Sequence, residues 1–173
     1  MHGGARLALA AVVAVGALSA GDGGVARADT LRCPDLAAAE QVGNCPSLRE
    51  LRILFGSTCG GEANPDAAKP GLCDSFEEFQ RQRATALWEA GEAGFAGYLP
   101  CALTAKDLAA GRLAAVAVAG KRVTRITCTY AGAGDGPVTL TLRRRGACAL
   151  PSGAAQGRAD CTADPAACAV DCK

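Results

Sequence analysis

Ten cysteines are the residues with the greatest capacity for chemistry in this 173-residue sequence. A CxxC spacing would favour metal binding or thiol redox chemistry, and the sequence contains none. An even number of cysteines without that spacing favours disulfides, up to five in an exported chain, and leaves their connectivity open. The predicted disulfide residues are Cys33, Cys45, Cys59, Cys73, Cys101, Cys128, Cys148, Cys161, Cys168 and Cys172.

Histidine chemistry is excluded from residues 29–173, because the single histidine is His2. That absence removes Ser-His-Asp and Cys-His catalysis, and histidine-bound zinc, from this part of the chain. Carboxylates remain as acid–base candidates, as adjacent Glu77 and Glu78 and as Glu89 and Glu92, three residues apart. Acids on an amphipathic helix usually form its solvated face, so we assign no catalytic residue and keep a carboxylate-dependent enzyme as an alternative.

A cofactor or metal ion is not predicted either. Residues Glu62, Asn64 and Asp66 place oxygen atoms at alternate positions, as calcium loops do. This segment lacks the glycine expected at its sixth position and has Cys73 at its twelfth, where a glutamate would belong. The glycine clusters also lack the spacing of phosphate-binding and dinucleotide-binding motifs.

Basic residues form the only charge cluster of note, Lys121, Arg122 and Arg125 with Arg143–Arg145, within a segment that is basic overall. Residues 29–110 carry a net charge of −5 and residues 111–173 carry +5, so residues 29–173 are neutral. Strand alternation places Arg125 beside Arg143, and like charges in that position destabilise a sheet unless a carboxylate relieves them. The preferred interpretation takes this carboxylate from the acidic part of the same chain, and the alternative takes it from a partner.

Arg125 and Arg143 are therefore the candidate partner-binding residues. An acidic protein or an anionic polymer of the cell envelope would suit them. Nucleic acid does not fit a neutral chain with only seven aromatic residues after position 28.

The first 28 residues have the order of a secretory signal peptide. One positive charge precedes the fourteen uncharged residues 7–20, and Ala26 and Ala28 supply small side chains for signal peptidase. Fourteen residues rise only about 21 Å as a helix, short of a bilayer core of about 30 Å. We predict cleavage after Ala28, with Ala20 as the alternative. This leaves residues 29–173 as a single domain, without a transmembrane segment, in the periplasm or outside the cell.

The apolar core of residues 29–173 is expected to be small. Leucine, isoleucine, valine and phenylalanine account for 26 of these 145 residues. That fraction is below what usually supports a good core, so disulfides must supply much of the stability.

Helices are expected mainly in the first half of this domain. Ser47 with Glu50, and Ser75 with Glu78, have the spacing of capping boxes. A shared apolar stripe extends the helix that begins at Ser75 as far as Ala90. Thr104 and Asp107 begin a third helix, and a strand at 116–118 is its alternative. The expected helices cover residues 34–40, 47–56, 75–90 and 104–119, with a loop at 57–73 and an irregular apolar segment at 95–103.

A β-hairpin is expected at residues 123–130 and 138–145, which alternate on both sides of the turn sequence AGAGDGP. On the buried face, Ile126, Cys128 and Tyr130 would lie opposite Leu142, Leu140 and Val138. On the other face, Arg125 would lie opposite Arg143. The tail from Cys148 is expected to be a loop that ends in a short helix from Asp164. Cys168 and Cys172 would lie one turn apart on that helix, each bonded to a distant cysteine.

These patterns predict an α+β fold, a small disulfide-rich domain with N-terminal helices packed on a C-terminal antiparallel hairpin or small sheet. They predict an exported, non-catalytic binding protein of the cell envelope, acting as an inhibitor or accessory subunit. A small-ligand carrier with a pocket around Trp88, Phe95 and Tyr98 is a further alternative. In general outline the hairpin resembles the small disulfide-bonded lysozyme inhibitors of bacterial envelopes, and no residue is assigned a role from this resemblance.

Overall fold

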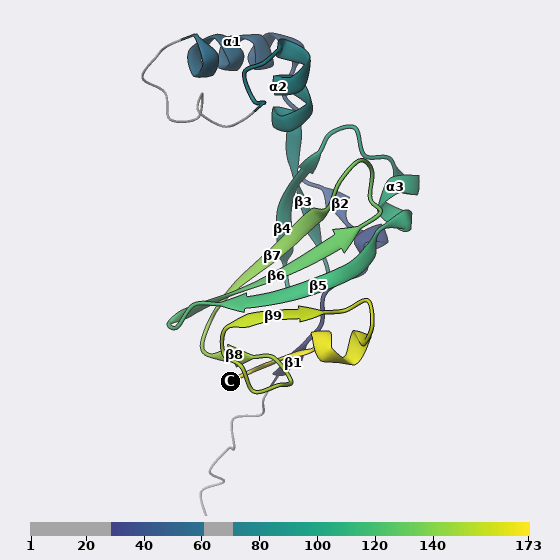
Figure 1. Cartoon of the computed structure of the whole chain (residues 1–173), viewed down its shortest axis with the longest axis vertical. Coiled ribbons are helices and arrows are strands. Elements are labelled where there is room, and N and C mark those ends of the chain that lie inside the picture. The colour runs from purple at the N-terminus through teal and green to yellow at the C-terminus, as the bar shows by residue number, and fades with distance from the viewer. Residues whose placement is uncertain (1–28, 61–70) are drawn as a thin grey trace, which may run out of the picture.

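The computed structural model describes residues 29–60 and 71–173, so the predicted signal peptide and residues Glu62, Asn64 and Asp66 lie outside the described part. The described part is an α+β protein with antiparallel sheets and five disulfides (Figure 1). One sheet has seven strands in the order β2-β3-β4-β7-β6-β5-β9, and the other has three in the order β1-β10-β8.

The strands of the larger sheet are β2 (Glu40–Gln41), β3 (Thr85–Ala90), β4 (Phe95–Pro100), β5 (Arg112–Ala119), β6 (Val123–Ala131), β7 (Val138–Arg145) and β9 (Gly157–Asp160). The smaller sheet contains β1 (Asp29–Leu31), β8 (Cys148–Ala149) and β10 (Val170–Cys172). The helical segments are η1 (Leu36–Ala38), α1 (Leu48–Cys59), α2 (Phe76–Arg83), α3 (Ala105–Ala110) and η3 (Pro165–Cys168).

The predicted hairpin is confirmed, residue for residue, as β6 and β7. Ile126 pairs with Leu142, Cys128 with Leu140, and Tyr130 with Val138. All of these side chains are buried except that of Leu142, which is half-buried. The Tyr130 hydroxyl donates a 2.7 Å hydrogen bond to the carbonyl oxygen of Pro34, so the N-terminal segment is fixed to this strand.

The predicted helix starts at Ser47, Ser75 and Thr104 are correct, but all three helices end at other residues than predicted. The Ser47 capping box with Glu50 forms as expected, but α1 continues through Gly56 to Cys59. Nothing lies within 4 Å of where a side chain at Gly56 would be, and one glycine in a helix costs only about 1 kcal/mol. The helix that begins after Ser75 ends at Arg83 instead of Ala90.

Residues 85–100 form a hairpin, β3 and β4, where we expected the end of a helix and an irregular segment. Ala86, Trp88 and Ala90 alternate towards the core, and pairing with β4 satisfies their backbone. Gly91 and Gly94 have positive φ angles and form the turn between the two strands. The helical stripe was a coincidence of spacing, because tertiary pairing outweighs a weak local preference.

The region 104–119 divides between a helix and a strand. Thr104 and Asp107 form the expected capping box, yet α3 ends at Ala110. Residues 112–119 form β5 between β6 and β9, so the strand alternative is correct there. β5 is flanked by a strand on each side, and this explains why its valines prefer the extended conformation.

The tail is more ordered than expected. It forms β8, β9 and β10, and the predicted final helix is only the short η3. Cys168 ends η3 and Cys172 lies on β10, so the two are not one helical turn apart. The predicted short helix at 34–40 is likewise reduced to η1, followed by β2.

The core is divided into two clusters. The larger cluster lies against the seven-stranded sheet and includes Leu36, Phe95, Val116, Tyr130 and Leu140. The smaller cluster joins α1 to α2 through Leu51, Leu72 and Phe79, with edge-to-face contacts among the phenylalanine rings. Figure 1 shows α1 and α2 together at one end of the sheet. The expected packing of the N-terminal helices on the hairpin is therefore not confirmed.

Candidate binding site

All ten predicted cysteines form disulfides, and none is free. The pairs are Cys33–Cys128, Cys45–Cys101, Cys59–Cys73, Cys148–Cys172 and Cys161–Cys168. No cysteine is thus available as a thiolate nucleophile. So many disulfides are typical of an extracellular or secreted protein.

The seven-stranded sheet has one face that is directed away from the core. Because successive side chains alternate between faces, the register identifies this open face on every strand. Most of its residues are small, polar or basic, and Leu87 and Glu89 on β3 add an aliphatic and an acidic side chain. The face carries Thr85, Leu87 and Glu89 on β3, Ala96 and Tyr98 on β4, Ala115, Ala117 and Ala119 on β5, Arg125, Thr127 and Thr129 on β6, and Thr139, Thr141 and Arg143 on β7.

Arg125 and Arg143 pair directly across β6 and β7 on the open face, as predicted. Both are exposed, and they border a hollow of about 270 Å³ whose other residues are Ala119, Gly120 and Val123. We call these five residues the basic hollow. One step along the strands, the hydroxyls of Thr127 and Thr141 lie 3.3 Å apart.

Neither arginine of the basic hollow forms an ion pair within residues 29–60 and 71–173. Among the described residues, no carboxylate of the chain therefore offsets the repulsion between Arg125 and Arg143, contrary to the preferred interpretation. The neighbouring Arg144 differs, because strand alternation turns it to the opposite face. There a guanidinium nitrogen of Arg144 lies 3.6 Å from a carboxylate oxygen of Asp29. The three-arginine run thus divides between the two faces, and only part of it is open to a partner.

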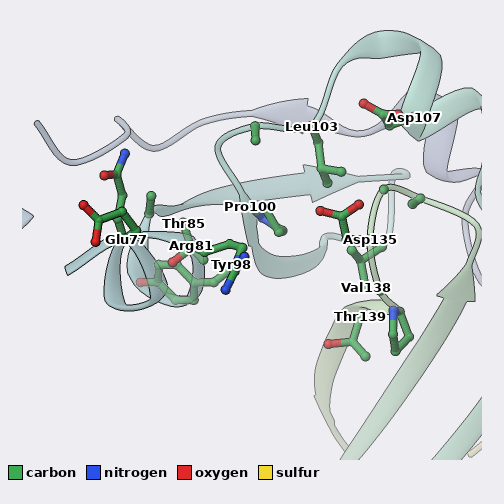
Figure 2. A pocket seen from close by; sticks show the side chains of 17 residues that line it. Glu77, Arg81, Thr85, Tyr98, Pro100, Leu103, Asp107, Asp135, Val138 and Thr139 are labelled. Carbon is green, nitrogen blue, oxygen red and sulfur yellow. The ribbon is translucent and has the colours of Figure 1, made fainter. Parts of the chain in front are cut away.

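A second hollow, the polar groove, lies at the other end of the open face. Its volume is about 830 Å³. Residues of α2 and of β4 line it on one side, and the turn between β6 and β7 lines it on the other. Figure 2 shows Glu77, Arg81 and Tyr98 grouped on one side, with Asp135 and Thr139 on the other. Tyr98 is 73% exposed, so its ring forms an aromatic surface at the groove.

Carboxylates outnumber basic groups in the polar groove. Glu77, Asp107 and Asp135 line it, against the single guanidinium of Arg81, which already forms an ion pair with Glu78. Asp107 accepts hydrogen bonds from the hydroxyl and the amide of Thr104, at 2.7 and 2.8 Å, which lower its pKa. Asp107 is therefore ionised at neutral pH and is also occupied in capping α3.

Trp88, Phe95 and Tyr98 do not line a common pocket among the described residues, where a carrier pocket was the alternative expectation. Trp88 and Phe95 are buried in the core, 8% and 1% exposed, whereas Tyr98 lies on the open face. Glu89 and Glu92 do not lie on a helix either, because Glu89 lies on β3 and Glu92 in the turn after it. The sequence does not predict the groove, because residues 95–103 are expected to be irregular, whereas Phe95–Pro100 form the strand β4. Alternation along that strand would have placed Tyr98 opposite the core.

The fold and the site define a class: a disulfide-bonded α+β domain with an open sheet face that carries a basic hollow and a polar groove. Comparison with protein-family models, curated protein sequences and solved structures found no match for the chain. In the described part, no three potential metal-ligating side chains come together. No helix within the same residues has the length and apolar character needed to span a membrane.

Proposed function

We propose that this chain is an exported, non-catalytic binding protein of the cell envelope, and that Arg125 and Arg143 bind an anionic partner. One observation carries the proposal: two exposed guanidinium groups lie side by side on an open face, with no carboxylate of the described residues paired to either. Two positive charges placed side by side repel each other and oppose folding, whereas an anion bound between them attracts both. Guanidinium groups suit this task because each can bind a carboxylate or phosphate through two parallel hydrogen bonds.

The scaffold beneath the two arginines is rigid. Cys128 follows Arg125 by three residues on β6, is fully buried, and is bonded to Cys33 in the N-terminal segment. The central position of β6 and β7 in the larger sheet also holds both backbones in register. A surface fixed before binding loses little conformational entropy on association. This supports a binding role, such as that of an inhibitor or an accessory subunit.

The proposed location, in the periplasm or outside the cell, rests on the predicted signal peptide and the five disulfides. Cleavage after Ala28 would leave Asp29 as the first residue, and Asp29 begins β1. In a periplasmic or external compartment the anionic partner is an acidic protein or an envelope polymer.

Exchanging Arg125 and Arg143 for glutamate together is expected to weaken binding to an anionic partner about tenfold or more. Polyglutamate and polygalacturonate serve as the acidic-protein and polymer probes, with affinities measured by calorimetry over a range of salt concentrations. The wild-type affinity falls as salt rises, and the variant loses most of this dependence. The melting temperature changes little, because exposed charges contribute little to folding.

The matched control is R32E/R49E, which makes the same change in charge at two exposed arginines that do not line the basic hollow. If R32E/R49E weakens binding as much as R125E/R143E, only net charge matters and the site is wrong. If R125E/R143E lowers the melting temperature and leaves binding intact, the two arginines serve folding and not a partner.

A further inference from the structure

We propose that the anionic partner is a polysaccharide, with sugar rings that stack on Tyr98 in the polar groove and acidic groups that contact Arg125 and Arg143. This inference rests on the proposed function and names the class of its ligand. Both hollows belong to the open face of the larger sheet. Thr139 lines the groove and Arg143 borders the basic hollow, four residues apart on β7.

Four residues of strand span about 13 Å, a distance that a short oligosaccharide can bridge. The side chains between the two hollows do not obstruct such a ligand. They include the half-buried hydroxyls of Thr127 and Thr141, next to the small side chains of Ala96 and Ala117. The hydroxyls can donate to or accept from a ligand along this path. The open face is therefore continuous from the groove to the arginines.

The groove combines an exposed aromatic ring with hydrogen-bonding side chains. Tyr98 is 73% exposed, the most exposed of the large hydrophobic side chains in the described residues. Around it lie the amide of Gln80 and the hydroxyls of Thr85 and Thr139. A sugar ring matches this composition, because its C–H face is apolar and its edge carries hydroxyl groups.

Charge distinguishes a polysaccharide from an acidic protein as the occupant. Glu77, Asp107 and Asp135 would repel the closely spaced carboxylates of an acidic polypeptide that entered the groove. Sugar hydroxyls instead donate hydrogen bonds to such carboxylates. A polymer that alternates neutral ring surfaces with acidic groups can satisfy the groove and the arginines together.

The test measures the binding of three probes to the whole disulfide-bonded domain by calorimetry: short oligogalacturonate that is partly methyl-esterified, so that neutral rings lie between acidic ones, its full methyl ester, and polyglutamate. Y98A is expected to bind oligogalacturonate about tenfold more weakly than wild type, because the stacking surface is lost. Y98F is the matched control and should stay within about twofold, since it keeps the ring. Tyr98 is exposed, so both variants should melt close to the wild-type temperature, and this is measured in parallel.

The full methyl ester distinguishes the contributions of the two hollows to binding, because it keeps the sugar rings and removes the negative charges. Its binding should be weaker than that of oligogalacturonate, sensitive to Y98A, and insensitive to R125E/R143E. Unchanged oligogalacturonate binding in Y98A, with loss in R125E/R143E, overturns the polysaccharide inference and leaves the proposed function standing. Wild-type affinity in R125E/R143E overturns both. Tighter binding of polyglutamate than of oligogalacturonate, or no binding of the glycan, also overturns the inference.

Discussion

Replacing both Cys33 and Cys128 with alanine is expected to lower the free energy of unfolding by about 5 kcal/mol. These cysteines are 95 residues apart in sequence, and cross-links that close long loops remove the most entropy from the unfolded chain. The bond also fixes the segment before η1 to β6, where Cys128 is fully buried. Few large apolar side chains are available to compensate. Urea denaturation under oxidising conditions measures the effect.

The matched control is C161A/C168A, which removes a bond between cysteines only seven residues apart. The same entropy argument gives about 2.5 kcal/mol for this variant. Complete reduction of the wild-type protein should abolish cooperative melting, and the unreduced protein should show no thiol that reacts with an alkylating agent. Equal losses for the two double variants, or a cooperative transition after full reduction, would contradict this account of the stability.

Gly97→Ala is expected to destabilise the protein by about 3 kcal/mol, although it adds a single methyl group. A Cβ at position 97 would overlap the carbonyl oxygen of Thr139 and come close to Leu140. This contact joins β4 to β7, the junction that connects β2-β3-β4 to the rest of the larger sheet. The backbone of Thr139 cannot move aside without weakening that pairing. Thermal and urea denaturation measure the loss.

Gly56→Ala provides the comparison, since it adds the same methyl group where nothing lies within 4 Å. Gly56 is exposed on α1, so alanine should stabilise the protein by up to about 1 kcal/mol. G97A should also weaken binding at the polar groove, because residues 98 and 139 flank the disturbed contact. A melting temperature for G97A at or above that of wild type would show that the β4–β7 junction is not constrained as described.

Patterns that depend on near neighbours were predictable from the sequence. The alternation on both sides of AGAGDGP gave the full register of β6 and β7, including the pairing of Arg125 with Arg143. The capping residues Ser47, Ser75 and Thr104 marked the starts of α1, α2 and α3 correctly. Such features follow from strand period and from hydrogen bonds within one turn, so distant residues have little influence on them.

Residues 84–119 show where prediction from near neighbours fails. They are rich in alanine and leucine, which suit a helix, yet they form β3, β4 and β5 around the short α3. Burial of Trp88, Phe95 and Val116 against other strands outweighed that preference, because helix propensity is worth less than 1 kcal/mol per residue.

The sequence by itself determined that the chain would contain disulfides, which residues would form them, and that Arg125 would lie beside Arg143. Only the tertiary structure decided which cysteines pair, because a bond such as Cys33–Cys128 depends on two segments 95 residues apart. It also decided that Tyr98 shares a face with the arginines, since β4 reaches that face by pairing with β7. The polar groove exists for the same reason: its walls come from α2, β4 and the β6–β7 turn, which only packing brings together.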